Sequence, residues 1–271
     1  MLRIIWKSLH TGVVTTRYPD GPAEPPDGFR GAPVLRAGRR VDDLPPPSVC
    51  PSGAISASPG RYAIDLASCI FCGRCAGNGP QAPIEIGRDF ELAARRRPDL
   101  IDGAGADGDG LIVIDEGTAG TAGDDQVAER IRRTLGRSLH LRHLDAGSCN
   151  ACDWELTALL NPVYDVRRLG IDFVASPRHA DGVIVTGPVT RNLEVAVRRT
   201  FEAVPEPRIV IAVGACACSG GIVGQSYASA GGVAEVLPVD VFIPGCPPRP
   251  QAIIYGILVA LGRLQARRQR G

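Results

Sequence analysis

Short apolar runs bounded by glycine or proline recur through the second half of the chain. Runs of this kind are typical of buried strands, and helical patterns separate them. The predicted strands are 139–145, 171–175, 182–186, 208–213 and 239–243. The predicted helices are 153–160, 192–203 and 249–267. Because strands and helices alternate, the strands should be parallel with crossover connections, and residues 137–271 should form a small doubly wound α/β sheet domain.

The first half of the chain lacks this regular alternation. Residues 1–36 are rich in glycine and proline, and we expect a packed arm whose opening ten residues form a short amphipathic helix. Residues 37–100 hold four cysteines and form a predicted separate domain. The composition of residues 101–136 is typical of a linker, with a short strand at LIVID (111–115) that ties back to the first domain. A helix over 124–136 should begin with acidic and end with basic residues.

Composition and charge narrow the classes of function. The chain has 271 residues, enough for two domains, and its formal net charge of +1 argues against nucleic acid as a partner. Nine cysteines, an odd number, and an opening segment too weakly apolar for a secretory signal argue against a disulfide framework. The longest apolar stretch, residues 252–262, is too short to span a bilayer. We therefore expect a cytoplasmic protein that reaches a membrane only through partner subunits.

The cysteines of the first half follow an incomplete iron–sulfur pattern. The segment CIFCGRC holds three of them, and a fourth stands upstream before a proline. Bacterial two-cluster ferredoxins carry the run C-x2-C-x2-C-x3-C-P twice, and the last cysteine of each run binds the other cluster. The positions at which this chain lacks the expected cysteine are Arg40, Asp43, Pro46 and Gly79.

Those four positions are the ligands of one whole cluster, so their loss leaves the other site complete. The pattern predicts a degenerate ferredoxin-like α+β domain over residues 37–100. Its remaining cysteines would bind one [4Fe–4S] cluster and are Cys50, Cys69, Cys72 and Cys75. A zinc site is the alternative, but structural zinc sites favour two well-separated C-x2-C pairs.

Four more cysteines follow predicted strands of the second domain. Cys149 and Cys152 come after the first of these strands, Cys216 after the fourth and Cys246 after the fifth. Loops at the carboxyl ends of parallel strands meet at one edge of a sheet, where α/β proteins bind their ligands. Since a [4Fe–4S] cluster needs four thiolates, the sequence predicts a second cluster at this edge.

Sequence motifs in both halves of the chain resemble those of known families. TGVVTTRYPD and CIFCGRC, with ELAARRRPDLI, resemble the ferredoxin-like electron-transfer subunit of formate hydrogenlyase and related membrane-bound hydrogenases. From GSCNACDWE to PGCPPRPQAIIYGILVAL, the chain resembles the small subunit of group 4 membrane-bound [NiFe]-hydrogenases and its relative in respiratory complex I. SPRHAD, VTGPVTR, GACACSGG and VDVFIPGCPP belong to the same pattern. The chain looks like a fusion of two subunits that are usually separate, the second of them flavodoxin-like in fold.

The resemblance implies a function. The positions of Cys149, Cys152, Cys216 and Cys246 match the ligands of the cluster next to the active site of the large subunit. The implied function is that of the iron–sulfur electron-transfer small subunit of a membrane-associated [NiFe]-hydrogenase or formate hydrogenlyase-like complex, with catalysis on the large subunit. The implied partners are that large subunit, the membrane-arm subunits behind it, and a ferredoxin or formate dehydrogenase as donor. The implied place is the inner face of the cell membrane.

Two other functions stay open. A complex-I-like, quinone-linked module without nickel would carry the same cysteines, because the nickel ligands would belong to the large subunit. A non-redox, metal-stabilised assembly scaffold would use the cysteines for structure alone. A phosphate loop and a G-x-G-x-x-G run after a strand are both absent from the sequence, so we expect no nucleotide cofactor.

Residues near the cysteines suggest further roles. Glu155 is a candidate proton relay, with an acid favoured by the helix N-terminus as the alternative. Arg178 and His179, in SPRHAD, would raise the potential of a nearby cluster, because positive charge stabilises the reduced state. Gly221 and the glycine before it should let the backbone approach the sulfurs closely. Cys218 is left over from the two groups of four and is expected to be a packed thiol.

Overall fold

The apolar runs of the second half form a five-stranded parallel sheet. The computed structural model describes residues 2–36, 39–77, 79, 81–107, 110–115 and 138–267. The strands of this sheet are β7 (Leu139–Asp145), β8 (Ile171–Phe173), β9 (Gly182–Thr186), β10 (Ile209–Val213) and β11 (Val241–Ile243). Their order is β11-β10-β9-β7-β8, which in chain order is the flavodoxin-like arrangement. The fold class predicted for the second half is therefore confirmed.

Burial explains why the sequence pattern predicted these strands. Every residue of β9 and of β10 is buried, as strands covered on both faces require. The predicted helices form as α3 (Ala151–Ala158), α4 (Arg191–Glu202) and α6 (Pro250–Ala260). The last of them was predicted to run to residue 267 but ends at Ala260, because Gly262 turns the chain with a φ of +65°. The second half also contains α5 (Ala215–Ser219), η4 (Val166–Leu169), η5 (Pro177–His179) and η6 (Val233–Glu235). These last four were not predicted, because a single turn is too short to show a helical period.

The first half is antiparallel. Its larger sheet has the order β2-β3-β5-β6, and β1 pairs with β4 in a separate ladder. The strands are β1 (Pro33–Leu35), β2 (Ile55–Ser58), β3 (Arg61–Asp65), β4 (Ile84–Ile86), β5 (Ile101–Asp107) and β6 (Gly110–Asp115). The short helices are η1 (Val41–Asp43), η2 (Pro47–Val49) and η3 (Arg97–Leu100).

The predicted linker needs a correction. The short strand expected at 111–115 forms within β6, but residues 101–107 form β5 and pair with β3 along its whole length. The segment IDGAGAD alternates glycine with alanine between two aspartates, so it has no hydrophobic period by which a strand could be recognised. The helix predicted at 124–136 lies outside the described residues.

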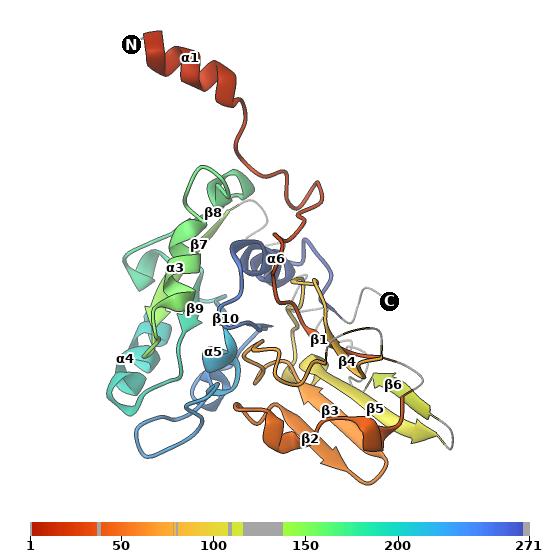
Figure 1. Cartoon of the computed structure of the whole chain (residues 1–271). Helices are drawn as coiled ribbons and strands as arrows, with labels where there is room; N and C mark the ends of the chain where they lie inside the picture. Colours follow the sequence, from red (N-terminus) through yellow and green to blue (C-terminus); the bar gives the residue numbers. More distant parts are fainter. Residues whose placement is uncertain are drawn as a thin grey trace.

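The two halves pack against each other around α6, which lies at the centre of Figure 1. Every residue of α6 is buried, as expected for a helix that is apolar all round. Ala94 extends the edge of the parallel sheet by exchanging backbone hydrogen bonds of 3.0 and 2.8 Å with Phe242 of β11. The Arg267 guanidinium pairs with both carboxylate oxygens of Asp102 at 2.8 and 2.7 Å. One hydrophobic cluster thus includes side chains from both halves, among them Leu66 and Phe242.

The N-terminal arm begins with the predicted helix, α1 (Leu2–Thr11), which stands away from the rest of the molecule in Figure 1. The arm then attaches to the second half, where the Thr16 amide donates to the Val163 carbonyl at 2.8 Å. Tyr18 is buried, and its hydroxyl donates to Glu91 Oε1 at 2.8 Å. Nowhere in the described ranges does a helix reach the length and apolarity that crossing a bilayer needs.

Candidate functional site

Loops at the carboxyl edge of the parallel sheet bring four cysteines together. We call Cys149, Cys152, Cys216 and Cys246 the second set. Cys149 follows β7, Cys152 lies at the start of α3, Cys216 lies in α5 and Cys246 follows β11. Burial, and then the charges of the other members, raise the pKa of Cys152, of Cys216 and of Cys246. The four thiols therefore lie near enough to influence one another at this edge of the sheet, and their binding of one cluster stays a prediction.

Glycine backbone closes around the sulfurs of this set. A Cβ on Gly214 would lie 2.5 Å from Sγ of Cys152, and one on Gly221 would lie 2.9 Å from Sγ of Cys216. Both glycines have positive φ, +89° and +56°, a conformation that other residues adopt at a cost. The close approach predicted for Gly221 is confirmed. The one predicted for Gly220 is wrong, because the atoms nearest to a Cβ there belong to Gly224 and Gly231 rather than to a sulfur. Gly214 was missed, although its place at the end of the apolar run RIVIAVG was a signal.

A network of polar side chains lies next to Cys149 and Cys152 and is centred on Asp153. Asp153 accepts hydrogen bonds from the hydroxyls of Thr186, at 2.7 Å, and of Ser148. Nε2 of His143 lies 2.8 Å from the same carboxylate. Burial lowers the pKa of His143, although Asp153 and Asp145 oppose the effect, so the imidazole favours its neutral form. Sequence reasoning missed this network, because it joins neighbouring strands whose pairing no local motif reveals.

The structure supports the roles expected of the remaining candidate residues to different degrees. Burial raises the pKa of Glu155, and Arg249 opposes that shift. A raised carboxyl pKa suits a proton relay at neutral pH; the relay stays a prediction, which proton-linked turnover of a Glu155→Gln variant would test. Arg178 and His179 lie in η5, between β8 and β9, and their effect on a cluster stays a prediction. Cys218 is buried in the core as expected.

The other four cysteines line a single cavity in the first half. We call Cys50, Cys69, Cys72 and Cys75 the first set. Cys50 follows η2, and the other three lie in the loop between β3 and β4. All four border the same cavity. Burial, and more weakly the charges of the other members, raise the pKa of Cys69 to about 12 and also raise that of Cys75.

Backbone amides point at two sulfurs of this set. The amide of Ala54 donates to Sγ of Cys50, and that of Phe71 to Sγ of Cys69, both at 3.3 Å. Burial raises the pKa of Cys50, but the hydrogen bonds from Ser52, Ala54 and Ile55 together lower it below the ordinary value. A thiolate is the form that binds metal, and hydrogen bonds to sulfur tune iron–sulfur clusters.

The arrangement of the sulfurs bears on which group could bind them. Within the described ranges, no three Cys, His, Asp or Glu side chains converge closely enough to hold one metal ion. A structural zinc ion would need four sulfurs about 2.3 Å from a single point. A [4Fe–4S] cluster binds each thiolate through a different iron atom, so it suits sulfurs spread around a shared cavity. The donor chemistry of both sets fits such a cluster, and their assignment as ligands stays a prediction.

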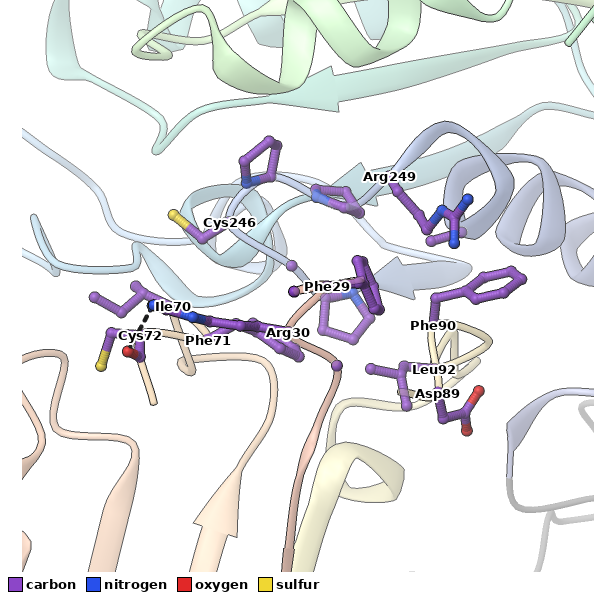
Figure 2. A pocket seen from close by; sticks show the side chains of 17 residues that line it. Phe29, Arg30, Ile70, Phe71, Cys72, Asp89, Phe90, Leu92, Cys246 and Arg249 are labelled. Atoms are coloured by element: carbon purple, nitrogen blue, oxygen red, sulfur yellow. Dashed lines mark hydrogen bonds between the residues drawn. The ribbon is translucent and has the colours of Figure 1, made fainter. Parts of the chain in front are cut away.

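A cavity of 410 Å³ separates the two sets (Figure 2). Cys72 of the first set and Cys246 of the second lie on opposite walls, with Phe29 and Arg30 of the N-terminal arm beside them. Nη1 of Arg30 donates to the Cys72 carbonyl at 2.9 Å. The arm therefore holds the Cys72 loop in position across from the Cys246 loop.

Arg249 borders the same cavity and was not singled out in the sequence. Its guanidinium lies 5.3 Å from the ring centre of Phe29 and 4.8 Å from that of Phe90. Its Nε donates to Gln251 at 2.9 Å, while the buried Nη1 finds no acceptor in the described part of the chain. Burial lowers the pKa of Arg249. Its position just after the PGCPP motif was the available signal for a cation beside Cys246.

Comparison with known proteins relates the second half of the chain to one family of oxidoreductase subunits. Residues 149–260 match the family model of NADH ubiquinone oxidoreductase, 20 Kd subunit. A probable membrane-bound hydrogenase subunit, mbhJ, of Pyrococcus furiosus is 48% identical over 130 residues, which cover 48% of this chain and 78% of that protein. Formate hydrogenlyase subunit 7 of Escherichia coli is 45% identical over 133 residues, which cover 49% of this chain and 52% of that protein.

A third relative comes from the respiratory enzymes. One subunit of the NADH-quinone oxidoreductase of Citrifermentans bemidjiense is 49% identical over 107 residues, covering 40% of this chain and 62% of that protein. The family match begins at Cys149 and ends with α6, so it contains the whole second set and leaves the first set outside. The chain therefore belongs to the family of the 20 Kd subunit of NADH ubiquinone oxidoreductase, whose members are subunits of oxidoreductases.

Proposed function

We propose that this chain is the iron–sulfur electron-transfer small subunit of a membrane-associated [NiFe]-hydrogenase or formate hydrogenlyase-like complex. Each cysteine set would hold one [4Fe–4S] cluster, which when bound supplies one-electron transfer. The names of two relatives, a membrane-bound hydrogenase subunit and a formate hydrogenlyase subunit, support this choice. Catalysis would take place on a separate large subunit.

The observation that carries the proposal is that one cysteine of each set borders the same cavity. Cys72 and Cys246 border it together, so the chain's own fold brings the sets to neighbouring positions. Phe29, Phe71 and Phe90 line this cavity and give the space between the two loops an aromatic wall. The chain's part in electron transfer is thus to hold the thiols and to orient the two loops.

The second set opens toward a partner. Cys149 and Cys246 are exposed, although metal-binding thiols need shielding from solvent and oxidants. Exposed apolar side chains lie in the same segments and are Trp154, Ile222, Val223 and Tyr227. Exposed aromatic and aliphatic side chains in one region mark protein interfaces. A large subunit that covers this edge would meet both needs, and membrane-arm subunits behind it would hold the chain at the inner face of the membrane.

The first half would act as a built-in ferredoxin-like domain. Its C-x2-C-x2-C loop lies between two antiparallel pairs, β2 with β3 and β1 with β4, and all four remaining cysteines share one cavity. This arrangement supports a degenerate ferredoxin-like domain with one cluster, fused to the small subunit. A ferredoxin or formate dehydrogenase would then exchange electrons with this half of the chain.

A complex-I-like module without nickel is the second candidate, and the family match favours it as much as the first. The two differ in the large subunit, where a nickel site would need two C-x2-C motifs. Sequencing the neighbouring large-subunit gene separates them. A zinc-stabilised scaffold is the third candidate, and the metal content of the purified chain decides it.

Iron content tests the proposal directly. Anaerobically purified protein should contain about eight iron atoms per chain and give EPR signals of two reduced clusters. Cys72→Ser and Cys216→Ser should each retain about four iron atoms and lose different signals, because they alter different sets. The control Cys218→Ala should keep about eight. Zinc without EPR signals, or iron loss from Cys218→Ala equal to that from Cys216→Ser, would contradict the proposal.

A further inference from the structure

The helix α1 at the N-terminal end has an apolar side that is exposed within the part of the chain that the structure describes. On α1, Ile5 is 56% exposed, Trp6 61% and Leu9 79%. Residues three and four apart face the same side of a helix, so Leu9 is a neighbour of both Ile5 and Trp6. These three side chains border one shallow surface hollow together with Arg3. An exposed apolar patch of this kind on a projecting helix marks a binding surface.

The charged side chains of α1 are all basic. Arg3, Lys7 and His10 follow one another at helical spacing beside the apolar side, and no acidic residue precedes Asp20. The His10 ring packs on the Trp6 indole, with ring centres 4.2 Å apart. Basic residues along one side and a tryptophan on the other are characteristic of helices that lie in a membrane interface. The complementary surface is therefore negatively charged with an apolar layer beneath it.

The rest of the arm fixes where this helix leaves the body. The Thr15 hydroxyl donates to the Pro162 carbonyl, and the Thr16 amide to the Val163 carbonyl, both at 2.8 Å. Tyr18 then enters the core. The ten residues of α1 rise about 15 Å, too little to cross a bilayer, and this length suits a helix that lies along a surface.

We propose that α1 lies in the headgroup layer of an anionic phospholipid membrane, with Ile5, Trp6 and Leu9 inserted and Arg3 and Lys7 against lipid phosphates. The chain then has its own membrane contact, in addition to any contact through partner subunits. The contact holds the body at a fixed place, because the anchored arm joins the helix to the segment around Val163.

Flotation of the full chain with lipid vesicles tests this inference. The chain should float with vesicles that contain about 30% phosphatidylglycerol, bind phosphatidylcholine vesicles far more weakly, and detach as salt is raised. Arg3→Gln and Lys7→Gln should each weaken binding about fivefold, the factor for one basic residue near an anionic surface. Ile5→Asp should abolish it. The matched control is Val195→Asp on α4, since Val195 is 57% exposed and Ile5 56%.

Fluorescence locates the contact. In a Trp154→Phe background, Trp6 is the only tryptophan left, and its emission should shift to the blue on anionic vesicles. Absence of flotation by the unmodified chain would overturn the inference and point to a protein partner for α1. Equal binding to neutral and anionic vesicles, or equal loss in Ile5→Asp and Val195→Asp, would overturn it as well.

Discussion

Two thiols of the first set differ in how readily they lose a proton. Hydrogen bonds from Ser52, Ala54 and Ile55 outweigh burial and lower the pKa of Cys50, whereas burial raises that of Cys69 to about 12. A ligand cysteine must be deprotonated, so metal binding releases the proton that the free thiol holds. Cys50 is therefore better prepared than Cys69 or Cys75 to receive a metal, because burial also raises the pKa of Cys75.

At Gly214 the second set depends on the absence of a side chain. Gly214→Ala would place a methyl group 2.5 Å from Sγ of Cys152 in a backbone with φ of +89°. We expect a loss of about 1–3 kcal/mol in the free energy of unfolding and loss of the iron bound by the second set, because the sulfur must move. Urea denaturation and iron analysis measure the two effects.

The control for this change is Gly224→Ala. Gly224 also has positive φ, +62°, but a Cβ there would meet nothing within 4 Å. This variant should show the cost of backbone strain and keep its iron. If Gly214→Ala retains as much iron as Gly224→Ala, the close approach of backbone to Cys152 has no part in holding the metal.

At the scale of elements, burial decided what the sequence could predict. The strands β7 and β9 form at the predicted residues, and the others of this sheet begin or end close to them, because buried parallel strands are continuous apolar runs. The strand β5 pairs with its neighbour β3 as regularly as the predicted strands pair with theirs. Its glycines and alanines form no apolar pattern, so the sequence did not predict it. The convergence of the second set followed from topology, whereas the His143–Asp153 contact depends on side-chain packing that no periodicity encodes.

The helix α6 provides a test of whether a steric clash in the core outweighs the higher helix propensity of alanine. Gly256→Ala in a helix interior normally adds about 1 kcal/mol to stability. Here the new Cβ would lie 2.3 Å from Cδ1 and 2.4 Å from Cγ1 of Ile243 on β11, and both residues are buried. We expect a net loss of about 1–3 kcal/mol in the free energy of unfolding, measured by urea denaturation. Adding Ile243→Val should restore part of the loss, and a stabilised single variant would disprove the packing argument.

At the scale of the whole molecule, α6 joins the two halves. It contacts the parallel sheet through Ile243, and the guanidinium of Arg95 in the first half donates to the Val259 carbonyl of the helix. The Ser219 hydroxyl adds a 3.0 Å hydrogen bond to the Ala67 carbonyl. Since the shared hydrophobic cluster also includes side chains from both halves, the boundary between the predicted domains is a packed interface. The two cysteine sets are held in fixed positions by this interface.

A fragment of residues 138–267 should therefore differ from the same residues in the full chain. Without the segment around Ala93 and Arg95, α6 loses part of its cover, and an apolar surface is left exposed. We expect the fragment to bind the dye ANS and to form aggregates, while the full chain unfolds in a single urea transition without binding the dye. A monomeric fragment with the stability of the full chain and no dye binding would show that the halves fold independently. In that case the spacing of the two cysteine sets could not be attributed to the packing of α6, and the facing positions of Cys72 and Cys246 would need another cause.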